Sequence, residues 1–186
     1  TPEGTEIGLR KNLAILCRIS TRVDLDEDKF LKSLELEGLN KEGTEGSDVF
    51  FNGRFIGGVN NAWEFAKKIK EKRRDSELPS QLNVRYDEGF GIISISTESG
   101  RALRPLIIAD NGISRLTKDH LVKVQQNEIV WNDLLKQKVI EYLDTAEEEN
   151  ALVALYENEL TPEHTHLEID PMDLLGVVTS LVPYGN

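Results

Sequence analysis

The sequence has one cysteine among 186 residues and no long hydrophobic run. Cys17 therefore cannot form an internal disulfide, and zinc sites built from cysteine clusters are excluded, so a reducing compartment, the cytoplasm, is expected. The longest apolar stretch, residues 174–182, is interrupted by Gly176, Thr179 and Ser180, whereas a membrane helix needs about 18 or more apolar residues in succession. We therefore expect neither a membrane-spanning segment nor a membrane partner.

Basic residues are outnumbered, because 22 lysines and arginines face 33 aspartates and glutamates, for a net charge of −11. Affinity for duplex DNA comes mainly from clustered Lys and Arg, so this balance argues against a surface that binds DNA throughout. The densest basic stretch comprises Lys67, Lys68, Lys70, Lys72, Arg73 and Arg74, with no aromatic residue among them. We interpret it as the exposed C-terminal end of a helix, where cations complement the helix dipole, over the alternative of a phosphate-tracking surface.

The common catalytic and nucleotide-binding motifs are missing from the sequence. Gly-x-Ser-x-Gly, the Walker A loop and Gly-x-Gly-x-x-Gly are absent, and Cys17 has no histidine near it in the sequence. We therefore assign no catalytic residue and expect no cofactor to be held by this chain.

Hydrophobic periodicity predicts an α+β fold, with several small, mostly antiparallel sheets and short flanking helices. Helices are expected from a cap at Asp24 or Asp26 to Gly38, and from about residues 61, 117 and 131, with a final helix capped by Asp170 and Pro171. The pair Asn52-Gly53 predicts a hairpin. Further strands are expected at residues 13–19, 82–86, 91–96, 102–109, 139–143 and 164–169. The three between 82 and 109 are expected to share one sheet with the helix from residue 61 beside it.

The pattern His164-x-His166-x-Glu168 places two imidazoles and a carboxylate on one face of a predicted strand. This set of side chains suits zinc or iron. Two histidines two residues apart are a weak signal without a further ligand, so we favour packing and hydrogen bonding between strands and expect no metal.

The acidic residues Asp144, Glu147, Glu148 and Glu149 offer oxygen ligands of the kind that magnesium and calcium prefer. They lack the alternating spacing and the glycine of a calcium loop. We favour a solvated face, or a negative patch for a basic partner, over a metal site.

Four segments together resemble the second-largest, beta-like subunit of multisubunit RNA polymerases in its archaeal and eukaryotic form. They are T-P-E-G at residues 1–4, G-R-A-L-R-P-L-I-I at 100–108, and the stretches 131–155, which contains E-Y-L-D, and 160–184, which contains T-H-L-E-I. The resemblance implies a piece of a longer polypeptide. It divides the chain into the end of the fork region (1–48), a first external domain (49–115), a second external domain (116–168) and the start of the hybrid-binding domain (169–186).

The resemblance also assigns roles to individual residues. Glu3 would lie near the fork loops that face the nucleotide-addition centre, and Lys11 and Asn12 would hold the supporting backbone. The residues expected to act structurally are Arg101, Arg104 and Pro105, which would fix a tight strand crossing, Glu141 and Asp144 of the E-Y-L-D signature, and Glu168 of the strand entering the next domain.

The implied function is a structural part in DNA-directed transcription. Catalytic magnesium would be held by the largest subunit, so this segment would be inactive alone and would meet other polymerase subunits, with template DNA and RNA only in the assembled enzyme. The short loops favour an archaeal origin. The alternatives are a free-standing acidic protein-interaction module and, more weakly, a metalloenzyme that uses His164, His166 and Glu168.

Overall fold

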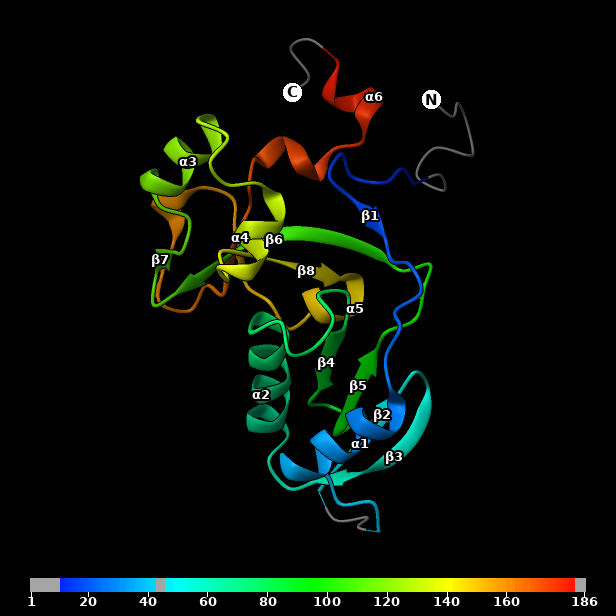
Figure 1. The fold of residues 1–186 in the computed structure, drawn as a ribbon. Coiled ribbons are helices and arrows are strands. Elements are labelled where there is room, and N and C mark those ends of the chain that lie inside the picture. The colour runs from blue at the N-terminus through cyan, green and yellow to red at the C-terminus, as the bar shows by residue number, and fades with distance from the viewer. Residues whose placement is uncertain (1–10, 43–45, 183–186) are drawn as a thin grey trace, which may run out of the picture.

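The computed structural model describes residues 11–42 and 46–182, which form two β-sheets with short helices around them (Figure 1). Glu3 lies outside the described residues. Both sheets are mixed, although most strand pairs are antiparallel. This arrangement confirms the predicted α+β class. Within the described residues, no helix is both long enough and apolar enough to cross a membrane.

The first sheet has the strand order β3-β2-β5-β4 and is covered by helices α1 and α2. Its elements are α1 (Glu27–Leu36), β2 (Ser47–Phe51), β3 (Arg54–Val59), α2 (Ala62–Arg74), β4 (Asn83–Asp87) and β5 (Ile92–Ser96). Asp26 caps α1 by accepting from the Lys29 amide, and Asn61 caps α2 by accepting from the Glu64 amide. Both helices follow the prediction. The apolar face of α1 supplies Phe30 to the buried core, and that of α2 supplies Phe65 and Ile69.

The turn between β2 and β3 confirms the hairpin predicted from Asn52 and Gly53. Their φ angles are +47° and +76°, and a two-residue hairpin turn of this kind needs positive φ at both positions. The register shifts between Val49 and Phe50, so β3 carries a bulge that bends it toward the chain before β2. As a result Gly58 exchanges two backbone hydrogen bonds of 2.9 Å with Asn40.

Replacing Gly57 in this bulge by alanine is expected to lower the free energy of unfolding by about 3 kcal/mol. Gly57 has a φ of +148°, and a Cβ there would overlap the Asn40 carbonyl oxygen. Gly53→Ala is the matched control, since its φ is also positive but nothing lies within 4 Å of the added methyl. That control should cost only about 1–2 kcal/mol. Urea denaturation measures both, and equal losses would contradict the proposed overlap.

The second sheet is built around the long strand β6 (Ala102–Asp110), which pairs with β1, β7, β8 and β10. Those partners, with β9 beside β10, are β1 (Arg18–Ile19), β7 (Ile113–Ser114), β8 (Ile140–Asp144), β9 (Val153–Ala154) and β10 (His166–Leu167). The helices of this part are α3 (Lys118–Gln125), α4 (Trp131–Lys136) and α5 (Thr145–Glu148), followed by a 3-10 turn, η2 (Glu157–Glu159). Thr117 caps α3.

The prediction that residues 102–109 share a sheet with the two preceding strands was wrong. The turn after β5 leads β6 away from the first sheet, and the Gly100 amide donates to the Ser20 carbonyl at the edge of β1. Leu103, Leu106 and Ile108 are fully buried, because β6 is a central strand with neighbours on both sides. Proximity in the sequence suggested a meander, but burial of this strand requires the later strands β8 and β10.

Two predictions near the ends of the described chain also need correction. Residues 13–19 do not form a buried strand, since only Arg18–Ile19 is extended and Leu13 is 55% exposed. Asp170 does cap a helical segment, but this is a 3-10 turn, η3 (Pro171–Leu174), and Gly176 separates it from the short helix α6 (Val177–Ser180). The early segment 13–19 and the late segment 171–180 lie at the same end of the molecule (Figure 1). A 2.9 Å hydrogen bond from the Ile15 amide to the Leu175 carbonyl joins them.

Candidate functional site

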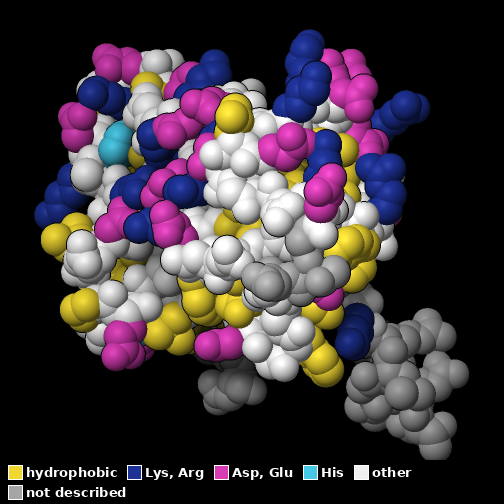
Figure 2. Space-filling model, turned by 90° about the horizontal axis from the view of Figure 1, so that it is seen from below, with side chains coloured by type: hydrophobic (Ala, Val, Ile, Leu, Met, Phe, Trp, Pro, Cys, Tyr) yellow, Lys and Arg dark blue, Asp and Glu magenta, His cyan; other side chains and the backbone are white. Residues whose placement is uncertain are grey.

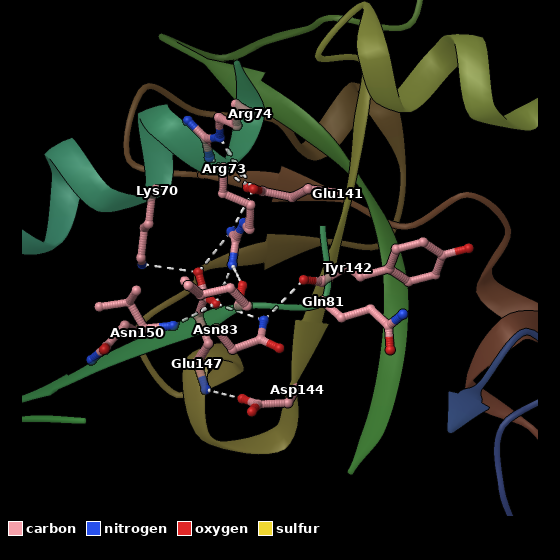
Figure 3. Close-up of polar contacts among 12 residues, drawn as sticks. Lys70, Arg73, Arg74, Gln81, Asn83, Glu141, Tyr142, Asp144, Glu147 and Asn150 are labelled. Carbon is pink, nitrogen blue, oxygen red and sulfur yellow. Dashed lines mark hydrogen bonds and ion pairs between the residues drawn. The ribbon is translucent and has the colours of Figure 1, made fainter. Parts of the chain in front are cut away.

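The two sheets meet at a cluster of buried charges that we call the ionic junction, formed by Arg73 and Arg74 of α2, Glu141 of β8 and Glu147 of α5 (Figure 3). The Arg73 guanidinium donates to Glu147 at 2.6 Å and 2.9 Å, to Glu141, and to the Leu82 carbonyl at 2.8 Å. Arg73 is 4% exposed, Glu141 4% and Glu147 1%. One arginine therefore holds two carboxylates from a different part of the chain inside the protein.

The electrostatics of the ionic junction follow from burial and pairing. Burial alone would raise the pKa of the Glu141 carboxyl, but Arg73, His166 and Arg74 hold that pKa well below its usual value. Burial likewise opposes ionisation of Glu147, and Arg73 with Lys70 keeps the pKa of this carboxyl below normal. Burial disfavours the charged form of Arg73, and the two carboxylates outweigh it and raise its pKa. All three groups are therefore charged at neutral pH.

Glu147 also holds the first sheet through β4. Its Oε2 accepts from the Asn83 side chain at 2.7 Å and from the Val84 amide at 3.0 Å, while the Asn83 side chain also donates to the Tyr142 carbonyl at 3.0 Å. Nearby, the Asn150 side chain pairs with both backbone groups of Tyr86, at 2.7 Å and 2.8 Å. Polar side chains thus replace a continuous β-ladder between the two sheets.

Arg101 lies where the chain passes from the first sheet into β6. Its guanidinium donates to Asp144 and to Asn83, each at 2.7 Å, and to the Gln81 carbonyl at 2.6 Å. Asp144 in turn caps α5 by accepting from the Glu147 amide at 2.8 Å. The structure therefore places Arg101 and Asp144 in one network with the ionic junction, and this network fixes the start of β6 against β4 and β8.

Arg104 and Pro105 lie further along β6. The Arg104 guanidinium donates to Glu168 at 2.8 Å and to Glu148. Burial raises the pKa of the Glu168 carboxyl despite this pairing. Pro105 lies opposite Tyr142 in the pairing of β6 with β8. Arg104 therefore joins β6 to α5 and to the segment after β10. Its two carboxylate partners differ from those of Arg73.

Two predictions about charged stretches were wrong. The basic stretch 67–74 is not uniformly exposed, because Arg73 points into the protein while Lys67 keeps 75% of its side chain in solvent. The acids at 144–149 are not a solvated face, because Asp144 and Glu147 are buried. The helical period places Lys70, Arg73 and Arg74 on the side of α2 that faces the ionic junction. The sequence of α2 alone could not show that the carboxylates of Glu141 and Glu147 lie opposite this side.

The His164, His166 and Glu168 side chains are directed at three different partners. His166 Nε2 lies 2.8 Å from Glu141, His164 Nδ1 lies 2.8 Å from the Thr161 hydroxyl, and Glu168 accepts from Arg104. No group of three or more potential metal ligands converges anywhere in residues 11–42 and 46–182. His166 instead extends the ionic junction to β10.

Lys11 and Asn12 lie at the exposed start of the described chain. The Asn12 side chain lies beside Gly176, where the early and late segments meet. Neither residue reaches the ionic junction. The residues that sequence reasoning missed there are Arg73 and Glu147 as a pair and Asn83 as their link. Only the Asp144-x-x-Glu147 spacing hinted at local capping.

Family models match both halves of this arrangement. The model described as RNA polymerase Rpb2, domain 4, matches residues 49–110, and that of RNA polymerase Rpb2, domain 5, matches residues 131–171. The chain belongs to the Rpb2 family of RNA polymerase subunits. This confirms the resemblance drawn from the sequence motifs.

Individual Rpb2-family relatives match along nearly the whole chain. DNA-directed RNA polymerase subunit Rpo2 of Sulfolobus acidocaldarius is 38% identical over 99% of this chain, and Rpo2 of Saccharolobus shibatae is 40% identical over the same share. DNA-directed RNA polymerase III subunit RPC2 of Saccharomyces cerevisiae is 35% identical over 99% of the chain. The chain spans 18%, 18% and 16% of these relatives, less than a fifth of their length.

The ionic junction therefore connects two Rpb2 domains. Arg73, Asn83 and Arg101 fall within the domain 4 match, and Glu141 and Glu147 fall within the domain 5 match. These contacts join residues 64 to 74 positions apart along the chain. Among its described residues no nucleophile is paired with a base, and both carboxylates are held by arginines, so the chemistry of the site is that of a structural clamp.

Proposed function

We propose that this chain is part of the second-largest subunit of an archaeal-type DNA-dependent RNA polymerase, in which it acts as a scaffold. The observation that carries the proposal is identity of 38–40% to archaeal Rpo2 subunits over 99% of the chain. Its share of each relative, 18%, supports membership of a longer polypeptide. The net charge that suggested a free-standing acidic module is equally expected of a surface that meets other subunits.

The ionic junction gives the scaffold its physical basis. A hinge between two domains would let their surfaces move independently, whereas Arg73, Glu141 and Glu147 tie α2 of one domain to β8 and α5 of the other. In the proposed enzyme, magnesium would be held by the largest subunit and would supply the charge that polarises the nucleotide phosphates. This chain contributes rigid placement of neighbouring surfaces and holds no cofactor.

The proposed partners are the other polymerase subunits, with template DNA and RNA reached only in the assembled enzyme in the cytoplasm. On the face seen from below, basic and acidic side chains are interleaved and neither sign covers a broad area (Figure 2). Tight binding to a nucleic acid backbone requires clustered cations. This face therefore suits protein contacts better than a path for DNA.

A segment exchange tests the proposal. The matched segment of Saccharolobus shibatae Rpo2 is replaced by this chain, and the polymerase is reconstituted from its subunits. We expect assembly and promoter-independent RNA synthesis close to that of the parental enzyme, and no synthesis by the 186-residue chain alone. A parallel exchange carrying Lys67→Met serves as control, since this exposed side chain should not affect assembly. An assembled but inactive exchange enzyme, or no assembly at all, would contradict the proposal.

A further inference from the structure

A pocket of about 320 Å³ lies beside the ionic junction, at the boundary between the two Rpb2 domains. It is lined by the end of α2, the segment 76–80, helix α4 and strand β8. Pockets at domain boundaries are frequent ligand sites, and this volume is at the lower end of the usual range. None of the roles given above to the ionic junction requires an open pocket there.

The charged groups of the pocket favour an anion. Arg73, Arg74 and Lys136 line it together with a single carboxylate, that of Glu141. Both oxygens of Glu141 already accept hydrogen bonds, Oε1 from Arg74 and His166 and Oε2 from Arg73 and Arg74. Glu141 therefore offers little to a bound cation. Even counting Glu147, which pairs with Arg73 from outside the lining, three cations face two carboxylates.

Two donors at the pocket remain without a partner. The Nε atom of Arg73 is buried and has no hydrogen-bond partner among the described residues. Lys136 is exposed and forms no ion pair within the described part of the chain. An unsatisfied buried donor costs about 1–3 kcal/mol, so negative charge placed beside the Arg73 guanidinium is favoured. The hydroxyls of Ser76 and Ser80 add further donors at the rim.

The rest of the lining selects among anions. Leu78, Leu135 and Ile140 form an apolar wall, which matches a hydrocarbon stem better than a hydrated phosphate. A nucleic acid would also bring many charges toward a chain with a net charge of −11, and long-range repulsion opposes that approach. A single carboxylate on an apolar stem fits the apolar wall and brings only one negative charge toward the chain.

We propose that this pocket binds a carboxylate carried on an apolar stem, supplied by a single glutamate in an apolar peptide segment of a partner polymerase subunit. The identity of the partner rests on the proposed function, whereas the binding chemistry does not. Arg74 and Lys136 receive the carboxylate, and Leu135 and Ile140 pack against the stem. The pocket thereby extends the clamp between the two domains of this chain to a second chain.

A titration of the isolated chain tests this proposal separately from the segment exchange. The probe is a short peptide that carries one glutamate between leucines, and its binding is followed by amide NMR. We expect shifts at Ser80, Asn132 and Lys136, and none with the same peptide carrying glutamine. Lys136→Glu should weaken binding roughly fivefold or more, and Lys67→Glu, on the exposed side of α2, should leave it unchanged. The Lys136 side chain is exposed, so the first variant is expected to fold.

Other outcomes would overturn the proposal. It fails if the glutamate peptide shifts no pocket amide at millimolar concentration, or if glutamine and glutamate peptides bind equally. Tighter binding of inorganic phosphate or a short single-stranded DNA would mark a phosphate site instead, and equal binding of free glutarate would remove the peptide as the source. If the peptide binds but the segment exchange fails, the pocket is still a carboxylate site. The proposal that a polymerase subunit supplies the carboxylate is then rejected.

Discussion

Replacing Arg73 by methionine is expected to lower the free energy of unfolding of the chain by about 3–5 kcal/mol. Methionine fills a similar volume on α2 and is a good helix former, so packing and helix propensity change little. The loss arises because Glu141 and Glu147, which are 4% and 1% exposed, keep their charges without their main cation. Urea denaturation followed by circular dichroism measures the change.

The matched control is Lys67→Met on the same helix, since 75% of the Lys67 side chain is exposed. This variant should stay within about 0.5 kcal/mol of the parent. Arg73→Lys should fall between the two, because an ammonium keeps the charge but cannot donate to both carboxylates and to the Leu82 carbonyl with the geometry of a guanidinium. A loss at Arg73→Met no larger than that of the control would show that the ionic junction does not stabilise the fold.

The local elements of this fold were predictable from the sequence, because their causes are local. Asp26 and Asn61 cap helices through amides three residues away, and Asn52 with Gly53 adopts the turn that their backbone freedom favours. The spacing of capping, turn and apolar residues along the sequence was enough to place these elements. The capping of η3 by Asp170 followed in the same way.

The assembly of the elements was not predictable in the same manner. Strand β6 follows β5 closely in the sequence, yet it pairs with β8 and β10, which come much later. The burial of Arg73 depends on carboxylates 68 and 74 residues away. A basic stretch that ends a helix and an acidic stretch after a strand each look solvated when considered separately, because the composition of one segment cannot show what lies opposite it.

The structural signature residues were predictable in part, because the resemblance identified them but did not give their partners. Arg101, Arg104 and Asp144 were singled out by family resemblance, and the structure places all three in ion pairs, Arg101 with Asp144 and Arg104 with Glu148 and Glu168. The role expected of Arg101 and Arg104, to fix a tight strand crossing, remains a prediction. Lys11 and Asn12 lie away from this boundary, and their proposed support of an active centre concerns the assembled enzyme.

Lowering the pH is expected to reduce the stability of the parent chain and to narrow its difference from Arg73→Met. The folded state lowers the pKa of Glu141 and of Glu147. Their stabilisation is therefore complete above the unfolded glutamate pKa of about 4.3 and is lost as the pH falls through the folded values. Glu168 and Asp173 act in the opposite direction, because burial raises their folded pKa values and their protonation on acidification favours the folded state. The carboxyls with lowered pKa outnumber these two, since Asp26, Glu37 and Asp119 join Glu141 and Glu147, so the net slope is toward acid unfolding.

The Arg73→Met variant should respond differently to acid. Without Arg73, burial dominates at Glu147, where Lys70 is the remaining cation, and weakens ionisation of Glu141, which keeps Arg74 and His166. Protonation of these carboxyls then relieves the buried charge that destabilises the variant, so between about pH 7 and pH 4 its stability should rise relative to that of the parent, whose ionic junction is still fully charged there. Denaturant titrations at several pH values in this window measure both proteins. The difference in unfolding free energy between the parent and Arg73→Met depends on pH only if unpaired carboxylates cause the loss. A difference that stays constant with pH would therefore assign the loss to packing.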